Sequence, residues 1–241
     1  MYGFLVFIYG LIFGSFFNVV ALRGLSGEKL TGFSHCPKCG MRLRAKNLVP
    51  VLSFLFQKGK CSNCGCKIDL IYPIFELSTA ISYLLLYTFY GISLKFVILV
   101  VLISALIIST LTDLKEAWVL DRVVIISFLI ILALRIADPV NIFIHVVSSI
   151  TLLVIFFVMS GFDKIGGGDA KLIAIMCLAM GLYNTILAIT IASVVCLIYT
   201  VMFAFVYKMK VKSIVIRFVP FLLVGTIICQ ILINSIFTYW L

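Results

Sequence analysis

Charged residues are scarce in this sequence. Lysine, arginine, aspartate and glutamate make up 12% of the 241 residues, whereas soluble domains carry about 25%. Hydrophobic residues account for 64% of the chain. The sequence also lacks an internal repeat of solenoid period. The shortage of charge excludes an ordinary soluble domain and predicts an all-α integral membrane protein that lies in a lipid bilayer.

The apolar runs predict about eight transmembrane helices. They lie at about residues 1–22, 73–91, 94–112, 122–137, 141–160, 169–183, 184–207 and 218–239. A helix needs roughly 20 apolar residues to cross the hydrocarbon core. The sixth and seventh runs meet at a weak turn signal, residues 181–184, so seven spans with one long bent helix is the alternative. Because no basic segment or small-residue cleavage site accompanies the first run, we expect a retained helix rather than a signal peptide.

The distribution of basic residues favours eight spans over seven. With the N-terminus outside, the inner loops and adjoining span ends hold 17 of the 19 lysines and arginines. Only Lys95 and Arg135 remain on the far side, as the positive-inside rule requires. A seven-span chain would place the basic residues of 208–217 outside. The net charge of +10 then reflects topology and anionic lipid, and we expect no nucleic-acid partner.

A polar segment at residues 23–72 interrupts the membrane protein, between a first transmembrane helix at 1–22 and a polytopic membrane domain at 73–241. It holds two CxxC pairs separated by 21 residues, Cys36 and Cys39 followed by Cys61 and Cys64. This spacing predicts a small zinc-ribbon-like insert, since Zn²⁺ takes four thiolates tetrahedrally. About 50 residues bury little core, so the metal would stabilise the fold.

Other interpretations of the cysteines fit the topology less well. Two disulfides or a redox pair would lie in the reducing cytoplasm, where disulfides are rare. Four protein thiolates leave no open position for catalysis, so we expect a structural metal. Cys66 is a fifth nearby thiol that competes as a ligand.

Two carboxylates at the same boundary of the membrane suggest hydrolysis of a membrane-embedded substrate. Asp113 ends an apolar run, and Asp169 follows three glycines, Gly166, Gly167 and Gly168, at the start of another. Aspartyl hydrolysis needs two close carboxyl groups, one as general base on water and one protonated partner that polarises the scissile carbonyl. The glycines permit φ > 0 or close approach of another segment. As simpler alternatives, Asp169 is a helix N-cap and Asp113 a boundary anchor.

Several segments in a fixed order extend this interpretation over nearly the whole chain. They are Gly14-Ser15-Phe16-Phe17-Asn18-Val19-Val20, the tetracysteine insert with Asn47-Leu48-Val49-Pro50 between its pairs, Tyr72-Pro73-Ile74-Phe75-Glu76, Gly166-Gly167-Gly168-Asp169-Ala170-Lys171-Leu172 and Pro220-Phe221-Leu222. The chain resembles the type IV prepilin peptidases, the GxGD family of membrane aspartyl proteases. One departure is Val119-Leu120-Asp121, where the family usually has Ile-Pro-Asp or Ile-Pro-Asn, so we expect a less rigid loop.

The resemblance implies roles for individual residues. Asp113 and Asp169 carry over as the catalytic pair, with Gly166–Gly168 closing on the substrate backbone. Asp121 occupies the place of the family's trailing Asp or Asn. Glu76 pairs with a base from the insert or serves a second activity. Lys171 tunes Asp169 or snorkels to the interface.

The resemblance also implies a function and a place in the cell. Members are multi-pass proteins of the bacterial inner membrane that cut the basic leader from type IV prepilins or pilin-like proteins at the cytoplasmic face, after a glycine. Many also methylate the new N-terminus with S-adenosylmethionine, and the complete insert is compatible with that second activity here, although no residue of the sequence is identified as binding the donor. The alternative from another class is a non-catalytic membrane adaptor that binds a cytoplasmic partner through its zinc ribbon.

Overall fold

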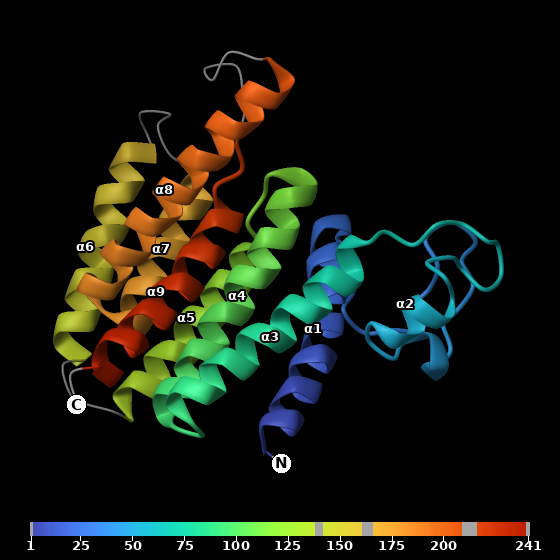
Figure 1. Ribbon diagram of the computed structural model, residues 1–241, viewed down its shortest axis with the longest axis horizontal. Helices are drawn as coiled ribbons and strands as arrows, with labels where there is room; N and C mark the ends of the chain where they lie inside the picture. The colour runs from blue at the N-terminus through green and yellow to red at the C-terminus, as the bar shows by residue number, and fades with distance from the viewer. Residues whose placement is uncertain (1, 138–141, 161–165, 209–215, 240–241) are drawn as a thin grey trace. The chain divides into compact units, whose positions relative to one another are not determined.

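The computed structural model describes residues 2–137, 142–160, 166–208 and 216–239, and these contain helices but no β-strand. The helices, shown in Figure 1, are α1 (Tyr2–Ser26), a 3-10 helix η1 (Ala45–Asn47), α2 (Leu52–Phe56), α3 (Ile71–Tyr90), α4 (Leu94–Glu116), α5 (Asp121–Ile136), α6 (Ile142–Ser160), α7 (Gly167–Met180), α8 (Leu182–Tyr207) and α9 (Val219–Tyr239). The chain divides into two compact units, Met1–Ile92 and Ser93–Leu241. The prediction of an all-helical protein is confirmed.

A helix corresponds to each of the eight predicted spans, but eight crossings are not confirmed. Among the described residues, four helices are long and apolar enough to cross a membrane: α1, α4, α6 and α8. With 16 and 14 residues, α5 and α7 reach about 24 and 21 Å, less than the ~30 Å hydrocarbon core. The break at residue 181 exists, because Gly181 takes φ 82° between α7 and α8.

The first unit is built on α1 packed against α3. Small residues permit this contact, since a Cβ on Gly10 would lie 2.5 Å from the Ala80 Cα and one on Gly14 would lie 2.7 Å from the Glu76 Cα. Two glycines four residues apart form the small-xxx-small pattern that brings helix backbones together in membranes. The Gly14 segment therefore serves helix packing.

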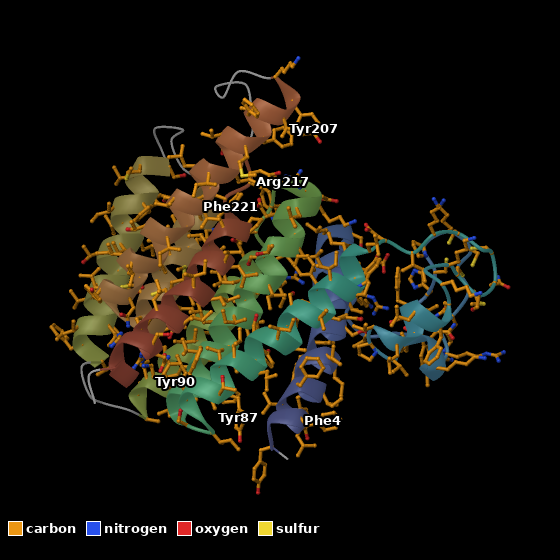
Figure 2. The ribbon with its side chains drawn as sticks, in the orientation of Figure 1. Phe4, Tyr87, Tyr90, Tyr207, Arg217 and Phe221 are labelled. Atoms are coloured by element: carbon orange, nitrogen blue, oxygen red, sulfur yellow. The ribbon has the colours of Figure 1, made fainter. Side chains whose placement is uncertain are left out.

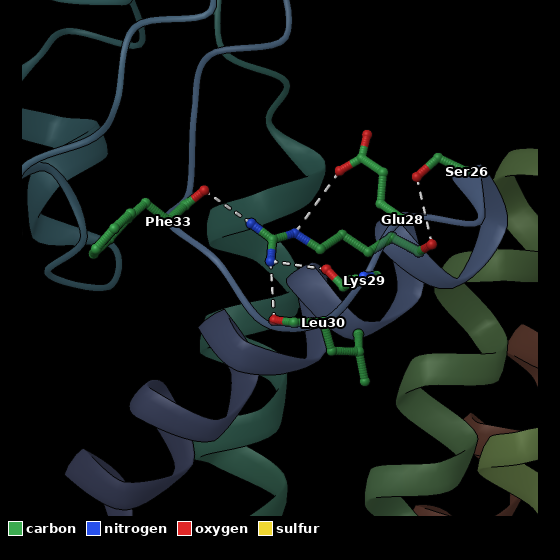
Figure 3. Close-up of polar contacts among 6 residues, drawn as sticks. Ser26, Glu28, Lys29, Leu30 and Phe33 are labelled. Atoms are coloured by element: carbon green, nitrogen blue, oxygen red, sulfur yellow. Dashed lines mark hydrogen bonds and ion pairs between the residues drawn. The ribbon is translucent and has the colours of Figure 1, made fainter.

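The polar segment after α1 is fastened by Arg23, a buried arginine in the last turn of that helix (Figure 3). Its guanidinium donates to the carbonyls of Leu30 and Phe33 at 2.9 and 3.0 Å and lies 4.0 Å from the Glu28 carboxylate. These bonds satisfy a buried cation and loop carbonyls together. The insert thus begins with a turn wrapped around one side chain.

In the second unit, α4 and α7 carry most of the buried side chains. α7 is in contact with α4, α5, α6 and α8, and every residue from Leu172 to Met180 is buried. A helix that is apolar on all sides belongs in a core. In contrast, α6 and α8 expose most of their apolar side chains, as expected of helices that face lipid.

Candidate active site

Asp113 lies in the last turn of α4 and is buried, with 7% of its surface exposed. The predicted span ends at residue 112, but the helix continues to Glu116 and ends at Ala117, which takes the left-handed conformation and whose N–H donates to the Asp113 carbonyl at 2.9 Å. The carboxylate therefore projects from regular helix. Its Oδ2 atom has no hydrogen-bond partner among the residues that the structure describes.

Asp169 is the third residue of α7 and is half-buried. The N-cap is Gly166, so the alternative that Asp169 is the N-cap is wrong. Its carboxylate turns back towards the N-cap and interacts with the backbone N–H of Gly166. This is the way an acidic side chain at the third helical position satisfies a free N–H group. The positive end of the helix dipole also favours a negative charge there.

The two aspartates come together. The charge of Asp113 is close enough to act on Asp169, and α4 and α7 pack against each other. The arrangement supplies the two acids that aspartyl hydrolysis needs.

The glycines before Asp169 allow this approach. Gly168 faces Val119, in the loop after α4, and a Cβ on Gly168 would lie 2.6 Å from the Val119 Cγ2. None of the three glycines takes a positive φ, so the left-handed conformation is not their purpose. Gly168 is required because the Asp113 loop packs on it.

Asp121 and Lys171 form an ion pair, with Lys171 Nζ 2.5 Å from Asp121 Oδ1. Both side chains are exposed, and the pair joins the first residue of α5 to the first turns of α7. Lys171 thus has a carboxylate partner other than Asp169.

Residues near the start of α9 also act on Asp113, and the sequence did not predict them. Arg217 acts on the Asp113 charge, and the backbone N–H of Val219 interacts with the same carboxylate. Arg217 lies two residues before the start of α9, and Phe221 lies in the first turn of that helix (Figure 2). Pro220 fits there because the first turn of a helix tolerates a residue without N–H. A basic residue just before the Pro220-Phe221-Leu222 segment was the available signal.

Glu76 is buried in the first unit, with 8% of its surface exposed. It accepts a hydrogen bond of 2.7 Å from the backbone N–H of Val51, a residue with φ 59°, and it interacts with the Ser15 hydroxyl. The partner from the insert is therefore a backbone amide and not a base. A positive φ in a β-branched residue is strained, so this bond helps hold the insert on α3.

The four predicted cysteines converge in the insert. The sulfur atoms of Cys36, Cys39, Cys61 and Cys64 all lie within 4.8 Å of one another, near the ~3.8 Å that tetrahedral Zn–S bonds of about 2.3 Å imply. All eight cysteines lie in the described part of the chain and none is in a disulfide. The four thiols fit a metal ion.

The two halves of the cysteine cluster share one backbone geometry. Gly40 and Gly65 take φ 68° and 69°, and their N–H groups donate to the carbonyls of Cys36 and Cys61, each at 2.9 Å. A Cβ on either glycine would meet nothing within 4 Å. The glycines are therefore present for their backbone conformation. Cys66 lies outside the four, with its sulfur 3.6 Å from that of Cys36.

Comparison with known proteins agrees with this geometry. The chain matches the bacterial peptidase A24 N-terminal domain over residues 8–90 and the type IV leader peptidase family over residues 100–201. A prepilin leader peptidase/N-methyltransferase of Bacillus subtilis is 35% identical over 191 residues, which cover 73% of each chain. The chain belongs to the type IV leader peptidase family. This confirms the resemblance and the expectation of an enzyme.

Other relatives in the type IV leader peptidase family carry the same description. The Dichelobacter nodosus protein is 32% identical over 178 residues, 69% of this chain and 61% of its own. The Neisseria gonorrhoeae protein is 26% identical over 227 residues, 79% of this chain and 78% of its own. Both are named prepilin leader peptidase/N-methyltransferase. No solved structure matches this chain.

Proposed function

We propose that this protein is an aspartic endopeptidase of the bacterial inner membrane that cleaves the leader peptide of type IV prepilins or pilin-like proteins at the cytoplasmic face. The observation that carries the proposal is that the charge of Asp113 acts on Asp169 in a chain of the type IV leader peptidase family. The predicted topology of eight spans, which places 17 of 19 basic residues inside, supports this sidedness.

Asp113 and Asp169 have different roles in the proposed reaction. Burial opposes a charge on Asp113, and Arg217 and the Val219 N–H act against that effect, so we assign Asp113 as the base that takes a proton from water. At Asp169, burial and the charge of Asp113 oppose ionisation more strongly than the Gly166 N–H favours it, so Asp169 is assigned as the protonated partner of the scissile carbonyl oxygen. Water adds to the carbonyl carbon, and collapse of the tetrahedral intermediate breaks the C–N bond as the amine takes a proton.

The cysteine cluster has a structural part in this proposal. Cys36, Cys39, Cys61 and Cys64 would hold one Zn²⁺, which stabilises an insert that has few buried residues. Four thiolates complete tetrahedral coordination, so no step of the cleavage passes through the metal.

Replacement of each aspartate by asparagine tests the proposal. Asp113→Asn and Asp169→Asn should each abolish cleavage of a co-expressed prepilin, while zinc content and membrane insertion stay at wild-type levels. Glu116→Gln is the matched control, since Glu116 is an exposed acid at the same end of α4. Full cleavage by either asparagine variant would favour a non-catalytic adaptor.

We also propose N-terminal methylation with S-adenosylmethionine, because the matching relatives are named as N-methyltransferases. Incubation of cleaved pilin with the enzyme and methyl-labelled S-adenosylmethionine should label the new N-terminus. Absence of label with active peptidase would remove this second activity and leave the first intact.

A further inference from the structure

Four side chains in the described part of the chain carry a buried nitrogen or oxygen atom without a hydrogen-bond partner: Asn18, Ser109, Thr110 and Asp113. Three of them lie between residues 109 and 113 of α4. Ser109 and Thr110 are 1% and 4% exposed. A buried polar atom without a partner is costly, so a cluster of three calls for an explanation. This cluster includes the carboxylate that the proposed reaction uses as its base.

Ser109 and Thr110 lie one helical turn before Asp113. Residues three and four apart are neighbours on the surface of a helix. Side chains in a helix point back towards its N-terminus, so the Asp113 carboxyl group extends over the turn that holds Ser109 and Thr110. The two hydroxyl groups and Asp113 Oδ2 therefore belong to one side of α4.

Other buried hydroxyl groups in the described helices are bonded to the helix backbone. Thr79 and Thr226 donate to the carbonyls four residues earlier at 2.6 and 2.7 Å, and Thr112 donates to the Ser109 carbonyl at 3.1 Å. Serine and threonine side chains often bond in this way within helices. Neither Ser109 nor Thr110 makes such a bond in the part of the chain that the structure describes. Both hydroxyl groups are therefore left for another partner.

We propose that Ser109 and Thr110 position the water molecule that Asp113 activates, an inference that rests on the proposed function. A buried water makes about three hydrogen bonds to polar groups that lack other partners, and α4 offers three such groups here. The water donates to Asp113 Oδ2 and to one hydroxyl oxygen, and it accepts a hydrogen bond from the other hydroxyl. Its remaining lone pair attacks the scissile carbonyl carbon as the proton passes to Asp113.

Removal of either hydroxyl group from the full-length protein tests the proposal. Ser109→Ala and Thr110→Val should each lower kcat for prepilin cleavage roughly tenfold, because one hydrogen bond to the attacking water is lost. KM should stay at the wild-type value, since the lost interaction acts on the transition state. Thr110→Ser keeps the hydroxyl group and should retain most of the rate.

Thr112→Val is the matched control, because the Thr112 hydroxyl is bonded to the backbone in the same turn of α4. It should leave kcat at the wild-type value. Thermal unfolding midpoints of Ser109→Ala and Thr110→Val should change little, since neither hydroxyl bonds to another described residue. A fall in kcat that is matched by Thr112→Val, or that follows a loss of folded protein, overturns the proposal in favour of a structural role.

The proposed function and this inference fail in different ways. Wild-type kcat in both Ser109→Ala and Thr110→Val, with an inactive Asp113→Asn, overturns the positioning role and leaves the aspartic endopeptidase intact. Full cleavage by Asp113→Asn overturns both.

Discussion

The side chain of Val119 packs directly on Gly168, so that a Cβ at residue 168 would lie 2.6 Å from Val119 Cγ2. This contact joins the loop after Asp113 to the glycines before Asp169. The Val119 side chain is β-branched and stiff, so any added atom must displace backbone. The position of one aspartate thus depends on the loop that follows the other.

We therefore expect Gly168→Ala to destabilise the protein by about 1–3 kcal/mol, as overpacking does. Cleavage should fall by up to about a hundredfold, because a displacement of 1 Å near reacting groups can cost that much. Thermal unfolding and prepilin cleavage rates measure both effects.

A second substitution identifies the contact as the cause. The double variant Val119→Ala/Gly168→Ala should recover part of the lost stability and activity. Gly167→Ala should destabilise less than Gly168→Ala, since its Cβ would meet Ser160 Oγ at an ordinary 3.5 Å. No recovery in the double variant would contradict this account.

Arg217 should contribute to turnover through Asp113. Arg217→Gln is expected to lower kcat roughly tenfold with little change in KM, because one charge-assisted interaction next to the reacting group is lost. Arg217→Lys should retain part of the rate. Steady-state cleavage of a prepilin peptide gives both constants.

The control for Arg217 is Arg122→Gln, an exposed arginine at the start of α5. It removes the same charge and should leave kcat at the wild-type value. An equal loss in both variants would mean that general surface charge, and not contact with Asp113, sets the rate.

The ion pair between Asp121 and Lys171 should be weak. Its side chains are 57% and 38% exposed, and exposed pairs contribute about 0.2–1 kcal/mol. In a double-mutant cycle of Asp121→Asn and Lys171→Gln, the coupling should lie in this range and shrink with added salt. A coupling well above this range that persists in 1 M salt would show that the pair is not exposed in the membrane.

Zinc binding should be lost in acid. The backbone N–H groups of Cys39 and Lys38 lower the pKa of the Cys36 thiol to about 6. The thiolate is therefore present at neutral pH and is protonated as the pH falls through about 6, and only the thiolate binds metal. After dialysis, zinc content should be near one per chain at pH 7 and fall as the pH is lowered, because protons compete with the metal for the four thiolates.

Cysteine variants test which thiols hold the zinc. Cys36→Ser should lose the metal, whereas Cys66→Ser should keep it, since Cys66 lies outside the group of four. Metal loss in Cys66→Ser with retention in Cys64→Ser would reassign the fourth ligand.

The sequence located the helices well because apolar runs of about 20 residues are a strong signal in a chain with few charges. It placed the end of α4 one turn early, since Asp113 was taken as the boundary of the membrane and the helix continues to Glu116. The number of membrane spans was harder to predict from the sequence. α5 and α7 are apolar but short, and periodicity does not distinguish a crossing from a buried core helix.

The sequence predicted the two acids of the candidate site, but it did not predict the contacts that support them. Asp113 and Asp169 stood out because carboxylates are costly beside a bilayer. The packing of Val119 on Gly168 and the approach of Arg217 to Asp113 depend on how helices far apart in sequence meet. No local pattern carries that information. The role of Glu76 was likewise hidden, since its partner is a backbone N–H group.

The length of α7 sets the depth of the candidate active site. Its far end is tied to α5, α6 and α8 by Arg135, His145 and Asn184, and Asp169 lies on its first turn. α7 has 14 residues, and its length therefore fixes the distance between its bonded far end and the Asp169 carboxylate. Insertion of one residue would advance Asp169 by about 1.5 Å and rotate it by about 100°. The number of residues in α7 is thus constrained together with the buried side chains that it carries.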